Sequence, residues 1–223
     1  MKKVLALLLI FIFAFGSTVS LAEDEPSVWA IEEVSEAIEL GFVPEDMQTG
    51  YKSNITRAEF AKVSVLFAAR QYGMESEEFV NYYLAEHVDG EGAQLTFKKD
   101  EFTDIADSEH KYYIEVANSI GIVQGKGNGI FDPDAFITRE EAATMLLRTY
   151  FCYGSAVKLG AKSAEVDNFS DAQQISSWAD TAVRYMYQWD VMKGVSDIKY
   201  APKSNYTREQ CYITFLRLYN MWS

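Results

Sequence analysis

The sequence contains one tetrapeptide pattern three times, and this repetition limits the possible folds more than any other feature. The pattern is Thr-Arg, then any residue, then Glu or Gln, and it occurs at residues 56–59, 138–141 and 207–210. An apolar residue precedes each copy, and a helical pattern of apolar residues follows it. A short repeated unit cannot bury its apolar face alone, so we expect three units to pack together.

The second and third units are the most alike. They align without a gap over residues 121–139 and 190–208, and this places Gly125 opposite Gly194. The first unit is looser, because its loop is two residues shorter and it lacks the Phe-x-Asp sequence that begins the other two. All three units are therefore predicted to be helix–loop–helix units, and the first unit matches the shared sequence pattern less closely.

Each tetrapeptide is typical of a capping box, in which Thr begins a helix and the Glu or Gln reaches back to its N–H. The Arg then occupies the first helical position, where the helix dipole disfavours a cation. Two interpretations stay open for the arginines. They bind an anion at the helix N-terminus, or they form internal ion pairs with aspartates of the Phe-x-Asp sequences. The residues concerned are Arg57, Arg139, Arg208, Asp104 and Asp171.

The remaining segments complete an all-α prediction. An insertion at residues 69–101 is predicted to contain an extra helix from Glu75 to Glu86, and residues 151–168 have the small and charged residues of a linker. No pair of segments reads as two strands. The predicted architecture is a set of three helical units with pseudo-threefold packing.

Residues 1–22 have the pattern of a secretory signal peptide. Lys2 and Lys3 form a positive start, an apolar run extends from Val4 to Phe15, and Ser20-Leu21-Ala22 resembles a cleavage site. No later stretch is apolar for long enough to span a membrane. We therefore expect an exported protein without a membrane span after cleavage.

Composition excludes some functions. The formal net charge of −13 argues against a nucleic-acid partner, which would need a basic face. Two Cys and two His leave little material for a zinc site, so no metal and no cofactor are predicted. Cys152 and Cys211 could pair, but two inert buried thiols are the simpler interpretation.

The three units resemble repeats of the S-layer homology family, at residues 26–68, 102–150 and 169–219. The resemblance depends on the three capping-box helices, each in register with an upstream helix, and on the Gly- and Pro-containing loops between them. It implies a three-pronged spindle with grooves between the prongs. It also implies non-covalent attachment to the bacterial cell wall through a secondary cell-wall polysaccharide that ends in N-acetylmannosamine with a pyruvate ketal. This polysaccharide could be peptidoglycan-linked.

The resemblance implies roles for individual residues. The ketal carboxylate would meet Arg57, Arg139 or Arg208, and the sugar ring would lie against Trp29 or Trp178. Gly125 and Gly194 would let the backbone approach the ligand, while Asp104 and Asp171 would help to shape the groove. The first unit departs from the pattern, because it lacks the acid and has Pro44-Glu45 opposite Gln124-Gly125. At least one groove is therefore predicted to be degenerate.

Three functions are compatible with the sequence. The first is a secreted wall anchor at the cell surface, without catalytic activity, that could carry an unknown cargo protein. The second is an enzyme acting on wall glycans, with a cleft built by residues 72–101, although no recognisable catalytic set supports it. The third is a self-assembling S-layer subunit, for which little chain remains outside the repeats.

Overall fold

The computed structural model describes residues 25–88, 91–153 and 163–221. The predicted signal peptide lies outside these residues. Over the described part the protein is helical, with isolated β-bridges and no strand, which confirms the all-α prediction. The α-helices are α1 (Ile31–Glu39), α2 (Arg57–Gln71), α3 (Ser76–Glu86), α4 (Lys111–Ser119), α5 (Arg139–Tyr153), α6 (Asp180–Gln188) and α7 (Arg208–Asn220). The 3₁₀ helices are η2 (Glu45–Met47), η3 (Glu165–Asn168) and η4 (Ala172–Gln174).

The three capping boxes form as predicted, and α2, α5 and α7 each begin at the arginine of the tetrapeptide. Thr56 and Thr207 each cap their helix with the reciprocal pair of hydrogen bonds. In α5 the Thr138 N–H donates to Glu141 Oε2 at 2.8 Å, and the Glu141 N–H donates to Thr138 Oγ1 at 3.4 Å. These bonds satisfy N–H groups that the helix itself cannot satisfy.

Thr138→Ala is therefore expected to lower the free energy of unfolding by about 1 kcal/mol, through loss of the N-cap. Chemical denaturation measures this change. Thr144→Ala is the matched control, because the Thr144 hydroxyl donates only to the Glu140 carbonyl one turn earlier in α5. Equal stability of Thr138→Ala and the parent protein would mean that the start of α5 does not depend on this cap.

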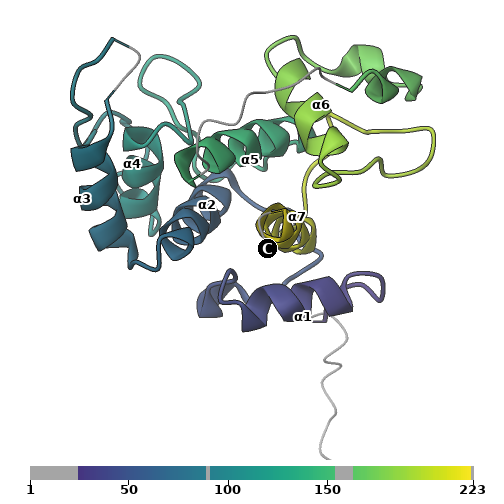
Figure 1. The fold of residues 1–223 in the computed structure, drawn as a ribbon, viewed down its shortest axis with the longest axis horizontal. Helices are drawn as coiled ribbons and strands as arrows, with labels where there is room; N and C mark the ends of the chain where they lie inside the picture. The colour runs from purple at the N-terminus through teal and green to yellow at the C-terminus, as the bar shows by residue number, and fades with distance from the viewer. Residues whose placement is uncertain (1–24, 89–90, 154–162, 222–223) are drawn as a thin grey trace, which may run out of the picture.

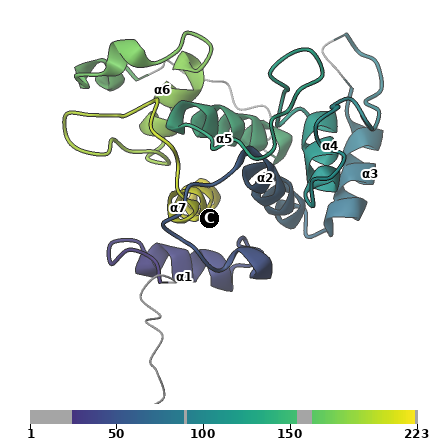
Figure 2. The same ribbon diagram turned by 180° about the vertical axis from the view of Figure 1, so that it is seen from behind.

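Each second helix packs against the first helix of the next unit. The pairs are α2 with α4, α5 with α6, and α7 with α1. Figures 1 and 2 show α2, α5 and α7 converging near the centre, with the other helices outside them. The pair of α7 and α1 joins the third unit back to the first, so the helix contacts form a closed ring.

Backbone hydrogen bonds follow the same ring. Each tetrapeptide arginine donates its N–H to a loop carbonyl of the next unit: Arg57 to Ala135 (2.9 Å), Arg139 to Ser204 (3.0 Å) and Arg208 to Ser53 (3.0 Å). The helix N-termini are thus bound to the loops that precede the next capping box. The pseudo-threefold spindle itself stays a prediction.

Buried aromatic rings fill the space where α2 meets α7. Phe67 and Phe215 have ring centroids 4.9 Å apart, and Phe60 and Phe215 have centroids 5.4 Å apart. All three side chains are fully buried. Burial of each such side chain stabilises the fold by about 1.5–3 kcal/mol, so the contact between the first and third units is strongly apolar.

The segments between the units are partly helical. Helix α3 occupies the segment where the sequence predicts an additional helix, and it packs on α2. Within residues 151–168, the first three residues belong to α5, residues 154–162 lie outside the described part, and η3 buries Val166.

Cys152 and Cys211 are buried free thiols, so the disulfide that the sequence left open is not formed. Burial raises the pKa of the Cys152 thiol to about 12 and also raises the pKa of Cys211. Both groups therefore stay protonated at neutral pH and behave as apolar side chains.

Candidate functional site

Two surface grooves share ten equivalent lining positions of the repeat, and Tyr206 additionally lines one of them. The Trp178 groove has a volume of about 390 Å³ and contains Arg57, residues 123–126, Glu141, Arg148 and Trp178. The Trp29 groove has a volume of about 500 Å³ and contains Arg139, residues 192–195, Gln210, Arg217 and Trp29. In each groove the tetrapeptide arginine, the glycine loop and the tryptophan come from three different units.

The two tryptophans stand at equivalent places with their indoles exposed. Trp29 is 59% exposed and Trp178 is 57% exposed, and each lies two residues before its helix begins. The alanine that follows each tryptophan is fully buried, which fixes the backbone there. An exposed indole at the edge of a groove can stack on the apolar face of a sugar ring.

Arg57 reaches across to the loop of the second unit. Its Nε donates to the Phe131 carbonyl at 2.9 Å, and its Nη2 donates to the Gln124 carbonyl at 3.1 Å. Its third nitrogen, Nη1, lies 3.3 Å from Glu141 Oε1. Burial lowers the pKa of Arg57, and the Glu141 charge acts in the opposite direction. All three guanidinium nitrogens of Arg57 thus have partners within the protein.

Arg139 repeats the first two contacts in the third unit. Its Nε donates to the Tyr200 carbonyl at 2.9 Å, and its Nη2 donates to the Lys193 carbonyl at 2.6 Å. The guanidinium also lies over the rings of Tyr200 and Tyr206. Among the described residues no carboxylate forms an ion pair with Arg139. The residue that corresponds to Glu141 in this groove is the neutral Gln210.

Arg208 is arranged differently. Its Nη1 donates to the Thr49 carbonyl at 2.9 Å, and its Nη2 forms an ion pair with Glu59. Its Nε is buried without a hydrogen-bond partner among the described residues. Both terminal nitrogens are therefore occupied, which leaves Arg208 poorly placed to meet an anion.

Of the two interpretations left open for the arginines, ion pairing with Asp104 and Asp171 is not what the structure shows. Asp104 accepts hydrogen bonds from the Phe131 and Asp132 N–H groups, and Asp171 accepts them from the Tyr200 and Ala201 N–H groups. The reason is local: Asp132 and Ala201 have φ of 63° and 58°, and the carboxylates satisfy the N–H groups of these turns. Burial opposes ionisation of Asp104, but these hydrogen bonds prevail and lower its pKa.

Gly125 and Gly194 lie in the groove loops and have a clear packing reason to be glycine. A Cβ on Gly125 would come within 2.6 Å of Phe102 Cε1, and one on Gly194 would come within 2.6 Å of Phe169 Cε1. The Phe of each Phe-x-Asp sequence therefore packs on the glycine of its own unit. The close approach of a ligand to these glycines stays a prediction.

Arg148 and Arg217 line the grooves, although neither was predicted as a site residue. Each lies nine residues after its tetrapeptide arginine, and this matched position was the available signal. Arg217 forms a two-fold ion pair with Glu33, at 2.7 and 2.9 Å. Arg148 Nη2 donates to Gln124 Oε1 at 3.0 Å and forms no ion pair among the described residues.

The third set of equivalent positions, which has Arg208 as its tetrapeptide arginine, contains different residues. Glu109 stands two residues before α4, at the place of the tryptophans. Leu66 stands nine residues after Arg57, at the place of Arg148 and Arg217. Pro44 and Glu45 already differ from Gln124 and Gly125 in the loop. These positions thus lack the indole and the outer arginine of the two grooves.

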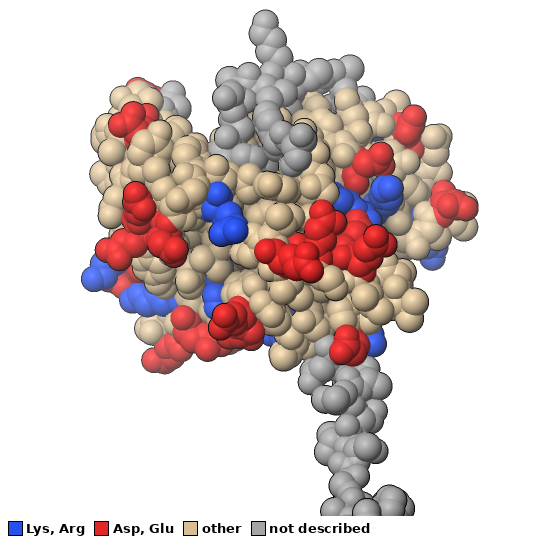
Figure 3. Space-filling view, turned by 60° about the horizontal axis from the view of Figure 1, so that its bottom comes forward, with Lys and Arg blue, Asp and Glu red and all other residues tan. Residues whose placement is uncertain are grey.

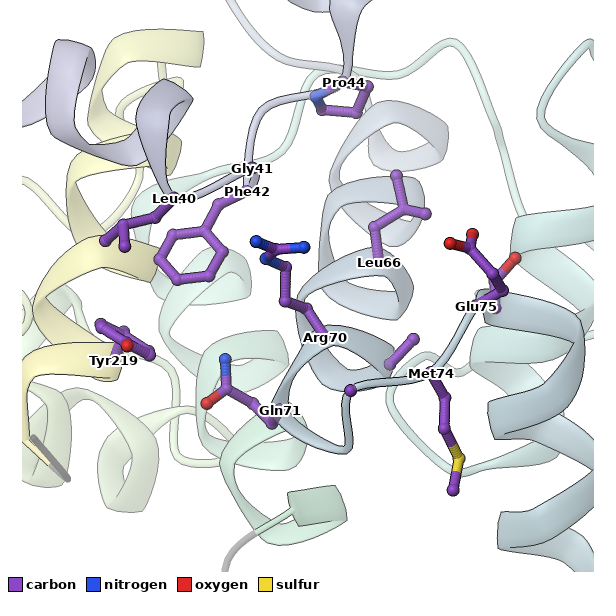
Figure 4. Close-up of a pocket in the computed structure, with 13 residues that line it drawn as sticks. Leu40, Gly41, Phe42, Pro44, Leu66, Arg70, Gln71, Met74, Glu75 and Tyr219 are labelled. Carbon is purple, nitrogen blue, oxygen red and sulfur yellow. The ribbon is translucent and has the colours of Figure 1, made fainter.

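A larger cavity of about 600 Å³ lies between the ends of α1 and α2 and the start of α3. Figure 4 shows the Arg70 guanidinium beside Phe42 and Gly41 on one side of this cavity, with Glu75 on the other. Glu75 is the one carboxylate in its lining. The cavity therefore lacks the carboxylate pair that most glycoside hydrolases use.

The surface carries the negative charge that the composition requires. In Figure 3 acidic side chains form several clusters on the face in view, and basic side chains are fewer. No helix in the described part combines the length and apolar character needed to cross a bilayer.

The comparison with known proteins agrees with the repeat structure. Residues 101–143 and 168–210 match the family model of the S-layer homology domain, so two segments of the chain are similar to this domain. They lie almost wholly in the second and third units, and the assignment of the first unit to this family stays a prediction. An S-layer homology domain is typical of cell-wall-binding proteins at the bacterial surface.

The chain is also similar to short parts of longer proteins. An endoglucanase of Bacillus sp. (strain KSM-635) is 36% identical over 121 residues, which are 54% of this chain and 12% of that protein. An amylopullulanase of Thermoanaerobacterium thermosulfurigenes is 30% identical over 49% of this chain and 6% of that protein. The middle cell wall protein of Brevibacillus brevis is 25% identical over 50% of this chain and 10% of that protein. The chain thus spans a small part of the length of these relatives.

Proposed function

We propose that this protein attaches non-covalently to the bacterial cell wall by binding the pyruvylated terminal sugar of a secondary cell-wall polysaccharide. The ligand occupies the Trp29 groove and the Trp178 groove. The observation that carries the proposal is the recurrence of one lining, with an exposed indole, a glycine loop and two arginines, in both grooves.

The lining suits a sugar that bears a carboxylate. The indole offers an apolar face for the ring, and the arginines offer hydrogen-bond donors with positive charge for the acid. Volumes of about 390 and 500 Å³ leave room for a sugar unit in each groove. Two grooves on one chain would bind a polymer more tightly than either groove alone.

We propose binding without catalysis. Glu141 is the one carboxylate that lines the Trp178 groove, and it already interacts with the Thr138 N–H and Arg57. The lining of the Trp29 groove contains no carboxylate. Neither groove therefore offers the pair of acids that glycoside hydrolysis usually needs.

The test is co-sedimentation with wall sacculi before and after the secondary polysaccharide is stripped from them. Binding that disappears after stripping supports the proposal, whereas unchanged binding would identify peptidoglycan as the partner. A reducing-end assay on the same samples tests the enzymatic alternative. Arg70→Ala is the control variant, because Arg70 lines the cavity outside both grooves and should leave sedimentation unchanged.

A further inference from the structure

The two grooves differ in what surrounds Nη1 of the tetrapeptide arginine, the guanidinium nitrogen that does not bond to the loop. Arg57 and Arg139 both use Nε and Nη2 on loop carbonyls. The Nη1 of Arg57 is then taken by Glu141 at 3.3 Å. No hydrogen-bond partner occupies the Nη1 of Arg139 within the described residues. This arginine lines the Trp29 groove together with Gln210.

Glu141 and Gln210 occupy the same position of their helices, where either residue completes the capping box. The Thr138 N–H donates to Glu141 Oε2 at 2.8 Å, and the Thr207 N–H donates to Gln210 Oε1 at 3.2 Å. The helix start therefore accepts Glu or Gln at this position. The charge of the residue can change without loss of the cap.

We propose that this third helical position determines which groove accepts the ligand carboxylate at its tetrapeptide arginine. Gln210 leaves Arg139 open to the carboxylate in the Trp29 groove. Glu141 neutralises Arg57 in the Trp178 groove, which therefore binds a carboxylated sugar less tightly at that arginine. The inference rests on the proposed function and adds a residue that sets the preference of each groove for an anion.

The other charged residues in the grooves support the assignment of Arg139 as the arginine that meets the carboxylate. In the Trp29 groove Arg217 is paired with Glu33, and Lys193 lies 3.7 Å from Asp190. Arg139 is thus the cation there without an acidic partner among the described residues. In the Trp178 groove Arg148 is the arginine without such a partner, so this groove keeps some attraction for an anion.

Reciprocal exchange at the two positions tests the proposal, with one groove measured at a time. Gln210→Glu is made in a Trp178→Ala background, and Glu141→Gln is made in a Trp29→Ala background. The probe is N-acetylmannosamine with a pyruvate ketal, and its methyl ester is the neutral control. Calorimetry should show about tenfold weaker binding of the acid for Gln210→Glu, and several-fold tighter binding for Glu141→Gln.

The ester should respond little to either exchange, because it carries no charge. Thermal melts should show that both variants stay folded, because the capping box is kept, although Glu141→Gln also loses the ion pair with Arg57. Acid affinities that stay unchanged after both exchanges would overturn the inference while leaving the proposed function intact. Absence of binding to acid and ester by the parent protein would contradict the proposed function itself, and the inference with it.

Discussion

Replacing Trp29 and Trp178 together with alanine is expected to weaken binding to wall sacculi by about 100-fold or more, because both grooves lose their aromatic platform. Large aromatic side chains often carry most of the binding energy of an interface. Loss of both grooves also removes the gain that two linked sites have on a polymer. Co-sedimentation over a range of protein concentrations gives the change in affinity.

The fold should tolerate the double substitution, since the indoles are 59% and 57% exposed and contribute little to the core. Each single variant keeps one groove and is expected to show an intermediate affinity. Replacement of the similarly exposed Phe136, which is 51% exposed and does not line either groove, is the matched control. If the folded double variant bound as tightly as the parent protein, the two grooves would not be the wall-binding sites.

Arg139→Ala is expected to lower the free energy of unfolding by about 3 kcal/mol or more. The substitution removes two charged hydrogen bonds, one buried and one partly buried, and each such bond contributes about 1.5–3 kcal/mol. The bonds in question join Arg139 to Tyr200 and Lys193. The two tyrosine rings next to the guanidinium lose a cation as well.

Urea denaturation monitored by circular dichroism measures this loss. Arg217→Ala is the control, because Arg217 and Glu33 are both partly exposed and such pairs contribute less than about 1 kcal/mol. A similar loss for the two variants would show that the contacts of Arg139 with the loop are not important for stability. Because Arg139 holds the loop in place, the exchange at Gln210 is the cleaner test of ligand binding.

The sequence predicted the local features of the fold well, because each depends on residues close together in the chain. A capping box needs only residues three positions apart, so the starts of α2, α5 and α7 followed from the tetrapeptides. The additional helix predicted from Glu75 to Glu86 matches α3 to within one residue at its start.

The partners of the arginines could not be predicted, because they are distant in sequence. Arg57 bonds to a carbonyl 74 residues away, and Arg139 bonds to one 61 residues away. Backbone carbonyls carry no sequence signature, whereas Asp104 and Asp171 are obvious candidates for a cation. The structure instead uses these acids to hold N–H groups of the loops.

The mixed origin of each groove has a consequence for dissection of the protein. The Trp29 groove takes its tryptophan from the first unit, Arg139 from the second and its loop from the third. A fragment limited to residues 101–210 would keep both matched repeats but lose Trp29 and Arg57. Such a fragment contains neither groove whole, so we expect wall binding to need all three units and to be lost from a single excised repeat.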